Sequence, residues 1–159
     1  MDIDTITNLK KISQKLRRSV IRELSAAGSG HSAGCLGFAD VMAVLYFHAM
    51  RLDPDNPNWE DRDIFVMSNG HYAPLLYATL AERGFFDKKE LANLRKFGSK
   101  LQGHPERDSL PGIETTSGPL GCGLSQAAGM AYSLQHLGGN SGRFVYCSLG
   151  DGELDEGNI

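Results

Sequence analysis

The sequence has little of what defines several protein classes. It contains three cysteines and one tryptophan in 159 residues, and its longest apolar run covers only residues 41–47. A membrane-spanning helix needs about 20 apolar residues, so the sequence predicts none. The first residues contain no apolar core of the kind found in signal peptides. A net charge of −3 gives no general attraction for nucleic acid or for an anionic membrane.

The cysteine and histidine patterns exclude common disulfide and metal motifs. Cys35, Cys122 and Cys147 are an odd, widely spaced set without a C-x-x-C pair, which predicts free thiols in a reducing, cytoplasmic setting. The histidine spacings do not fit a zinc signature. The acidic C-terminal stretch does not fit a calcium-binding EF-hand loop, because its sixth position must be glycine and is Glu156. With 41% hydrophobic and 22% charged residues, the composition suits one globular domain.

The C-terminal stretch combines a strand pattern with a glycine-rich acidic turn. Residues 143–149 form a short apolar run, rich in aromatic and β-branched side chains, between Gly139 and Gly150. This pattern predicts a strand buried on both faces, as in a parallel sheet covered by helices. Gly150-Asp151-Gly152 follows where that strand ends, and open α/β sheets bind ligands there. Asp151 offers the hard oxygen that Mg²⁺ prefers, but on these residues alone an ordinary acidic turn fits as well as half of a metal–diphosphate site.

Helical patterns fill the first third of the chain. An amphipathic helix is predicted up to Ala27, where Gly28 ends it. A second helix is predicted over residues 38–50, and its expected buried stripe consists of Val41, Met42, Leu45, Tyr46 and Met50. Between them, residues 28–33 match the dinucleotide fingerprint G-x-G-x-x-G/A. That fingerprint requires a strand before it, and because a helix is predicted there we reject a nicotinamide or flavin site.

A second strand–turn–helix unit and a long loop occupy the middle of the chain. A short buried strand is predicted over residues 64–67, followed by a turn and a helix over residues 73–83. One more short helix, capped by Asp87, is predicted over residues 86–97. Residues 98–118 lack periodicity, and a loop of that length usually indicates either function or a wrong assignment.

The helix after this loop is predicted to begin at about Gly123. Its N-terminus carries partial positive charge, which suits an anionic or electron-rich ligand. Its expected buried side consists of Leu124, Ala127, Ala128, Ala131 and Leu134.

Three histidines stand beside glycine in predicted turns or loops: His31, His71 and His104. Each alone would more often be structural than functional. Together, around one predicted sheet, they favour a binding or catalytic site. Near-neutral imidazoles suit proton transfer and hydrogen bonding to substrates.

Five blocks, in order along nearly the whole chain, resemble the N-terminal, thiamine-diphosphate-binding part of transketolases, particularly the separately encoded N-terminal subunit of split transketolases. They are AGSGH (residues 27–31), FVMSNGH (65–71), LQGHP (101–105), GPLGCG (118–123) and GDGELDEG (150–157). The resemblance implies an α/β fold, a three-layer parallel sheet flanked by helices, incomplete at the C-terminus. It makes residues 1–159 the N-terminal portion of the thiamine-diphosphate-binding domain, truncated after the GDG motif.

The resemblance also implies cofactors and roles. Thiamine diphosphate would bind with Mg²⁺, and Asp151 would bind that metal beside Gly152. His71 matches a histidine that contacts the diphosphate, and His31 and His104 match histidines near the reactive carbon. The remaining cofactor-binding positions are Gly118, Pro119 and Leu120, which match the segment at the aminopyrimidine and thiazolium, and Glu156, which matches an acidic residue at the subunit interface.

The implied reaction moves a two-carbon ketol unit from a ketose phosphate to an aldose phosphate. The expected partners are sugar phosphates and a C-terminal subunit or downstream region, in a dimer or heterotetramer. The alternatives are a non-catalytic truncated remnant and another thiamine-diphosphate enzyme such as deoxyxylulose-phosphate synthase. Ser32-Ala33 and Cys122 depart from the family's usual Pro-Gly and glutamine. Because the chain stops before the family's metal-binding asparagine, we expect the 159 residues alone to be inactive.

Overall fold

The computed structural model describes residues 1–137 and 142–159. Gly139, which precedes the predicted C-terminal strand, lies outside the described residues. The chain forms two compact units, which are described separately. Unit 1 comprises residues 1–50 and 71–103, and unit 2 comprises residues 51–70 and 104–159. Among the described residues, no helix has the length and apolar character needed to cross a membrane.

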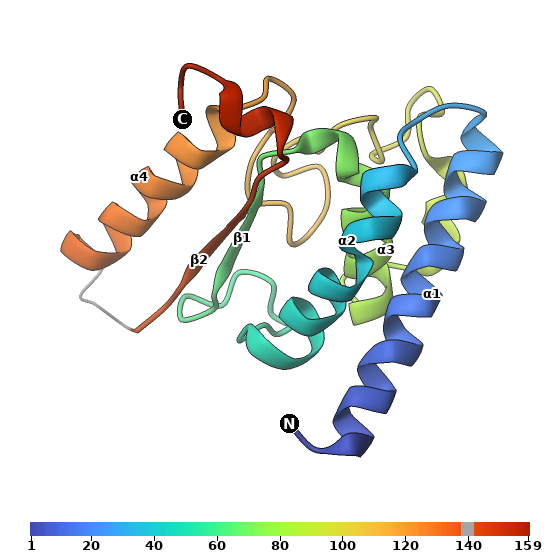
Figure 1. Ribbon diagram of the computed structural model, residues 1–159, viewed down its shortest axis with the longest axis horizontal. Helices are drawn as coiled ribbons and strands as arrows, with labels where there is room; N and C mark the ends of the chain where they lie inside the picture. Colours follow the sequence, from blue (N-terminus) through green and yellow to red (C-terminus); the bar gives the residue numbers. More distant parts are fainter. Residues whose placement is uncertain (138–141) are drawn as a thin grey trace. The chain divides into compact units, whose positions relative to one another are not determined.

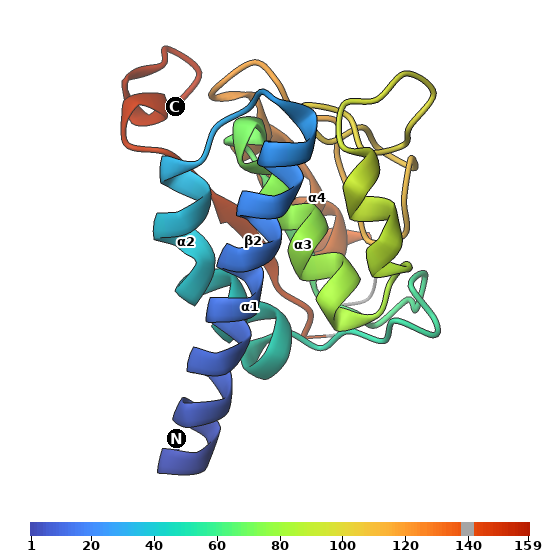
Figure 2. The same cartoon turned by 90° about the vertical axis from the view of Figure 1, so that its right-hand side faces the viewer.

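Unit 1 is helical and is built around α1 (Ile3–Ala27), α2 (Ala33–Val44) and α3 (Ala73–Arg83). Figures 1 and 2 show α1 alongside both α2 and α3, in agreement with their contacts. Asp2 caps α1 by accepting a hydrogen bond from the Thr5 backbone N–H at 2.7 Å. Gly28 ends the helix in the left-handed region, with φ of 65°. The predicted end of the first helix is therefore confirmed.

The predicted second helix has the wrong start, and two residues predicted as buried are not: Val41 is exposed and Leu45 is half-buried. Its α-helical part begins at Ala33, and a π-helical turn, η1 (Leu45–Ala49), continues it. Val41 is 44% exposed, whereas Met42, Tyr46 and Met50 are buried. The buried face is displaced from the predicted one because α2 turns the small side chains of Ala39 and Ala43 inward together with Met42.

The helix predicted over residues 86–97 is shorter and of a different kind. It is a 3₁₀-helix, η3 (Lys88–Asn93), and Leu94 leaves it in a non-helical conformation. The predicted cap is confirmed, because the Asp87 carboxylate accepts a hydrogen bond from the Lys89 N–H at 2.9 Å. Poorer hydrogen-bond geometry keeps 3₁₀ segments short, so η3 ends well before residue 97.

Unit 2 contains two parallel strands, β1 (Ile64–Met67) and β2 (Val145–Ser148). Ile64 lies opposite Val145, and Met67 lies opposite Ser148, so the carboxyl ends of both strands meet at one edge. The helix α4 (Cys122–His136) contacts both strands, and a short 3₁₀-helix, η4 (Gly152–Asp155), follows β2 (Figure 1). The turn η2 (Gly70–Tyr72) continues the chain from β1 towards α3. A parallel α/β arrangement is thus confirmed.

Two burial predictions in unit 2 are wrong. Ser148 is buried, but the other three residues of β2 are only half-buried, because β1 is the one strand that pairs with β2 among the described residues. On α4, Ala127 is buried, whereas Ala128 and Ala131 are exposed. Helix α4 also begins one residue earlier than predicted, at Cys122. Both elements therefore bury less apolar surface than their sequences suggest.

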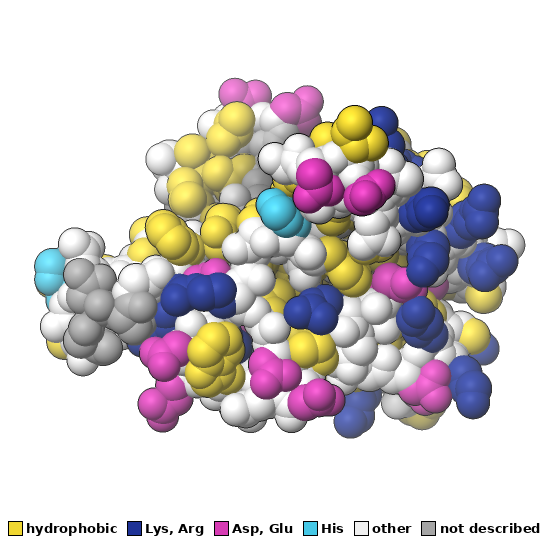
Figure 3. Space-filling model, turned by 90° about the horizontal axis from the view of Figure 1, so that it is seen from below, with side chains coloured by type: hydrophobic (Ala, Val, Ile, Leu, Met, Phe, Trp, Pro, Cys, Tyr) yellow, Lys and Arg dark blue, Asp and Glu magenta, His cyan; other side chains and the backbone are white. Residues whose placement is uncertain are grey.

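The amino ends of the two strands are held by a buried carboxylate. Asp63 is 1% exposed and accepts hydrogen bonds from the Arg51 side chain and from the Phe144 N–H, each at 2.9 Å. Burial raises the pKa of Asp63, but the hydrogen bonds from Arg51 and Phe144 and the charge of Arg51 together outweigh burial and leave that pKa below its usual value. The face in Figure 3 carries both acidic and basic side chains, and Lys and Arg side chains gather on its right-hand side.

Candidate functional site

The carboxyl ends of β1 and β2 are joined by a hydrogen bond between two side chains. The Ser148 hydroxyl donates a hydrogen bond to the Asn69 side-chain oxygen at 2.6 Å, and both residues are buried. This bond links the turn after β1 to the end of β2, directly before the glycine-rich acidic turn. The strand ends that the sequence predicts as a ligand site are therefore adjacent in unit 2.

A buried glutamate, Glu153, forms hydrogen bonds to three segments of the chain at this edge. Its carboxylate accepts a hydrogen bond from the Ser68 hydroxyl, one from the Gly121 N–H at 2.8 Å, and one from the Gly150 N–H at 3.0 Å. The side chain is 2% exposed. Donors from three segments of the chain therefore converge on this one carboxylate.

The long loop after residue 98 places His104 at the same edge. The Ser117 hydroxyl donates to the carbonyl oxygen of Met67, the last residue of β1, at 2.6 Å. The Ser117 N–H donates to the Pro105 carbonyl oxygen at 3.0 Å, which folds the loop back on itself. A Cβ atom at Gly70 would lie 2.7 Å from the Ser117 side chain and 3.1 Å from the His104 ring. Glycine at this position is what lets both side chains approach the end of β1.

Among the predicted cofactor-binding residues of unit 2, two glycines have free space beside their backbone, and the predicted metal ligand is an exposed carboxylate. Asp151 and Gly152 are exposed, and a Cβ atom at Gly118 or Gly152 would meet no described atom within 4 Å. Pro119 is exposed and Leu120 is half-buried. These features suit a ligand that approaches the backbone closely and carries phosphate.

Glu156 lies next to the start of α4. A Cβ atom at Gly121 would be 3.0 Å from the Glu156 Cβ, and Gly121 itself has φ of 82°, in the left-handed region. The end of the chain is thereby brought to the segment that contains Gly118, Pro119 and Leu120. The carboxylate of Glu156 is exposed.

Unit 1 holds the other two predicted histidines close together. The rings of His31 and His71 lie 5.3 Å apart between centroids, and the rings of His71 and Tyr72 lie 4.6 Å apart in an edge-to-face arrangement. His31 is exposed at the turn between α1 and α2, and His71 is half-exposed at the start of α3. The structure therefore groups His31 with His71 in unit 1, whereas His104 belongs to unit 2.

The described residues contain no group of three or more His, Cys, Asp or Glu side chains that could hold a metal ion. Asp151 is the predicted metal ligand, and a single carboxylate leaves most of the octahedral shell of Mg²⁺ to other donors. Mg²⁺ commonly takes one or two protein carboxylates together with substrate phosphates. The donor type thus suits Mg²⁺ when a diphosphate completes the shell.

All three cysteines are free thiols. Burial raises the pKa of Cys35 to about 11 and that of Cys147 to about 11. Cys122 is half-exposed at the first residue of α4, and its sulfur accepts a weak hydrogen bond from the Asn158 side chain at 3.8 Å.

Sequence reasoning missed four residues that shape these sites: Ser68, Asn69, Tyr72 and Glu153. A signal existed for Glu153, because a glutamate three residues after a turn can reach back to a free backbone N–H, as in a capping box. Glu153 does so towards Gly150. Its bonds to Ser68 and Gly121 join residues distant in sequence, so no local pattern predicts them.

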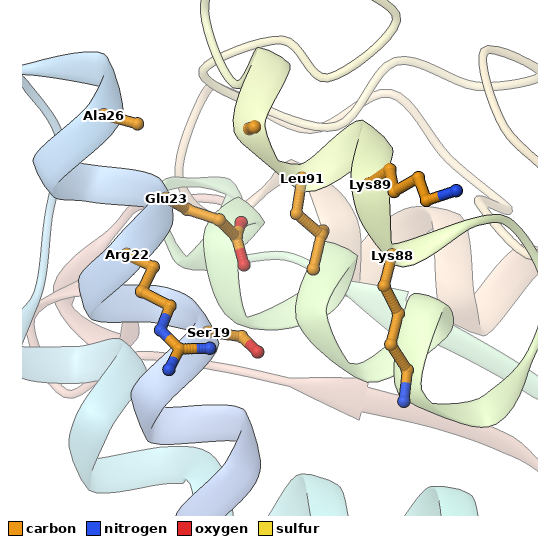
Figure 4. A pocket seen from close by; sticks show the side chains of 8 residues that line it. Ser19, Arg22, Glu23, Ala26, Lys88, Lys89 and Leu91 are labelled. Atoms are coloured by element: carbon orange, nitrogen blue, oxygen red, sulfur yellow. The ribbon is translucent and has the colours of Figure 1, made fainter.

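A separate pocket of about 420 Å³ lies in unit 1 between α1 and η3. Figure 4 shows Glu23 extending from α1 towards Leu91 of η3, with Lys88 and Lys89 at the start of η3. Glu23 is 2% exposed, and among the described residues neither of its carboxylate oxygens has a hydrogen-bond partner. Burial raises the pKa of Glu23 to about 9.

Sequence comparisons identify the family of the chain. Residues 9–159 match a family model described as "Transketolase, thiamine diphosphate binding domain". Human transketolase is 46% identical over 99% of this chain, which covers 25% of the human protein. A 6-deoxy-6-sulfo-D-fructose transketolase subunit from Clostridium sp. (strain MSTE9) is 40% identical over 96% of the chain, which covers 54% of that subunit. The chain thus spans only part of the length of its curated relatives.

Solved structures give the same result. Transketolase from Leishmania mexicana matches 94% of the chain with a TM-score of 0.89 and 37% identity, and the match covers 24% of that protein. Transketolase from Campylobacter jejuni matches 99% of the chain with a TM-score of 0.84 and 36% identity, and the match covers 25% of that protein. The fold is therefore an incomplete α/β thiamine-diphosphate-binding fold, and the chain belongs to the family of transketolase thiamine diphosphate binding domains.

Proposed function

We propose that this chain is the cofactor-binding component of a transketolase, which transfers a two-carbon ketol unit from a ketose phosphate to an aldose phosphate. The observation that carries the proposal is the convergence of three segments at the carboxyl ends of β1 and β2. Glu153 bonds to residues of all three: Ser68, Gly121 and Gly150. Open α/β sheets bind nucleotide-like and diphosphate ligands at that edge.

The residues present fit thiamine diphosphate and Mg²⁺. In this proposal Asp151 would supply a carboxylate oxygen to the metal, and the open backbone at Gly152 would accommodate the phosphates. His71 would hydrogen-bond the diphosphate. The backbone of Gly118, Pro119 and Leu120 would bind the aminopyrimidine, and the Leu120 side chain would contact the thiazolium. When bound, the cofactor supplies a nucleophilic carbon and an electron sink, which protein side chains lack.

The histidines of the chain would act on the substrate. In this proposal His31 and His104 bind substrate hydroxyls and donate hydrogen bonds to oxygens that gain negative charge. A donor fixed in place before the reaction stabilises such charge more effectively than water, because it need not reorient. An imidazole also takes up or releases a proton near neutral pH, so either histidine can move a proton at a substrate hydroxyl.

We infer that the active protein needs more than these 159 residues. The site has one carboxylate for Mg²⁺, β2 is half-buried, and the chain spans a quarter of human transketolase. The proposal therefore assigns residues 1–159 to the N-terminal portion of the cofactor-binding domain, with a downstream region or a C-terminal subunit completing a dimer or heterotetramer. Glu156, exposed beside Gly121, would lie at that interface. Free thiols support a reducing compartment, and we propose the cytoplasm.

A second candidate is a cofactor-free component that only pairs with an intact subunit. The observation that favours it is the lack, among the described residues, of any cluster of three metal-ligating side chains. In that case Asp151 would have no metal to bind. The two candidates differ in whether the assembled protein binds thiamine diphosphate.

Titration calorimetry with thiamine diphosphate, with and without Mg²⁺, distinguishes the two candidates. For the assembled protein we expect Mg²⁺-dependent binding, followed by ketol transfer from a ketose phosphate to an aldose phosphate. For the isolated 159 residues we expect little binding and no transfer, because Asp151 alone leaves the metal short of ligands. If the assembled protein bound no cofactor, the proposed function would be wrong and the pairing role would remain.

A further inference from the structure

Glu153 makes the densest set of tertiary hydrogen bonds at the candidate site. It is 2% exposed, and its two carboxylate oxygens accept hydrogen bonds from different segments. Oε1 accepts from the Ser68 hydroxyl and from the Gly121 N–H at 2.8 Å, whereas Oε2 accepts from the Gly150 N–H at 3.0 Å. One side chain therefore spans segments that lie 85, 32 and 3 residues away in sequence.

Two of those segments are the ones assigned to the two ends of the cofactor. Gly150 begins the diphosphate segment, residues 150–152. Gly121 directly follows the pyrimidine segment, residues 118–120. A carboxylate held between backbone N–H groups of both segments fixes the spacing and orientation of one relative to the other.

Close packing at the third segment makes the linkage rigid. A Cβ atom at Gly123, on the first turn of α4, would lie 2.4 Å from the side chain of Ser68 and 2.6 Å from its Cα. The first turn of α4 therefore rests directly on the residue that follows β1. Ser68 is 1% exposed, so its hydroxyl is held in place as a donor to Glu153.

We propose that Glu153 is a positioning residue that couples the diphosphate segment to the pyrimidine segment before any cofactor is bound. This inference rests on the proposed function for the identity of the ligand, but the linkage itself belongs to the chain alone. Pre-positioning removes the free energy that ordering two loops would otherwise subtract from binding. The benefit is largest for a ligand that touches both segments at once.

The matched test uses Glu153→Gln with Asp155→Asn as its control. Both substitutions remove one negative charge from η4 at nearly constant volume, but Asp155 is exposed. A glutamine retains one accepting oxygen and presents an N–H₂ group where the other oxygen stood, so it cannot accept from both Gly121 and Gly150. Because hydrogen bonds to charged groups are among the stronger ones, we expect amide hydrogen exchange at one or both glycines to accelerate roughly 10- to 100-fold. Asp155→Asn should leave both rates unchanged.

The second readout separates coupling from simple support of the fold. In the assembled, cofactor-free protein, the affinities for Mg²⁺–thiamine diphosphate and for Mg²⁺–inorganic diphosphate are measured by calorimetry. Under the proposed function, inorganic diphosphate would contact the diphosphate segment and His71 but would not reach the pyrimidine segment. We therefore expect Glu153→Gln to weaken thiamine diphosphate at least tenfold more than inorganic diphosphate, with turnover at saturating cofactor changed only a few-fold.

Several results would overturn the inference. Unchanged exchange at both glycines would show that Glu153 does not hold them, and equal loss of affinity for the two ligands would show support without coupling. If Glu153→Gln does not fold, Ser68→Ala tests the same linkage, and it must accelerate exchange at Gly121 more than at Gly150. If the unsubstituted protein binds neither ligand, the proposed function fails, whereas the exchange experiment still decides whether Glu153 links the segments.

Discussion

Replacing Glu23 with glutamine is expected to stabilise the protein at neutral pH. Glu23 lies on the buried face of α1, in line with Leu9, Ile12, Leu16 and Val20. Among the described residues its carboxylate oxygens have no hydrogen-bond partner, so ionisation of Glu23 would leave an unpaired charge in the interior. The chain therefore holds this side chain in its neutral form.

The magnitude follows from the pKa of Glu23, which burial raises from 4.5 to about 9. The raised value means that the folded state binds the proton more tightly than the unfolded state. The corresponding stability is fully present below pH 4.5 and is lost progressively as pH rises towards 9. Each pKa unit corresponds to about 1.36 kcal/mol, so the loss at pH 7 is at most about 3 kcal/mol. Glutamine mimics the neutral carboxyl and does not titrate, so Glu23→Gln should avoid this loss.

The assay is urea unfolding of the chain and of Glu23→Gln across about pH 4.5 to 9. We expect equal stability at the acidic end and a growing advantage for the variant as pH rises. Glu90→Gln is the matched control, because Glu90 is an exposed residue of η3 near the same pocket. Parallel curves for the chain and Glu23→Gln would refute the reasoning, and would mean that water in the pocket solvates the carboxylate.

Three further predictions concern the candidate site. In the assembled protein, Asp151→Ala should abolish Mg²⁺-dependent cofactor binding, whereas His104→Ala should retain the cofactor and mainly lower kcat. If calorimetry showed equal losses of cofactor affinity in both variants, the role of His104 would be contradicted. In alkylation followed by mass mapping, half-exposed Cys122 should react before buried Cys35, whose pKa is raised to about 11. Bound cofactor should slow the alkylation of Cys122, and faster labelling of Cys35 would contradict the prediction. Gly123→Ala should lower the free energy of unfolding by roughly 1–3 kcal/mol in urea titrations, because the added methyl group would overlap the residue after β1.

Elements with strong local signals were predictable from the sequence. The bounds of β1 and α3 are as predicted, and the end of α1 follows from Gly28, because each depends on periodicity or on a glycine that favours a left-handed conformation. The predicted buried face of α2 was wrong because tertiary packing selects Ala39 and Ala43 for burial. Alanine is only weakly apolar, so the sequence pattern predicts burial of Val41 instead.

The candidate site was predictable as a set of blocks but not as an arrangement. Glycines and histidines near predicted strand ends identify the segments, and the parallel pairing of β1 and β2 brings two of them together. The bonds of Glu153 to Ser68 and Gly121 depend on how the loop after residue 98 and α4 pack against β1. Contacts between residues this far apart in sequence leave no periodic trace, so only the fold reveals them.

The two buried glutamates show why burial alone does not indicate a role. Glu23 and Glu153 are each 2% exposed, so both have lost nearly all contact with water. Three donors replace water at Glu153, whereas no described residue donates to Glu23. A carboxylate with donors stabilises the fold in its charged form, and one without donors destabilises it when charged. The same change, glutamate to glutamine, is therefore expected to lower the free energy of unfolding at Glu153 and to raise it at Glu23 at pH 7.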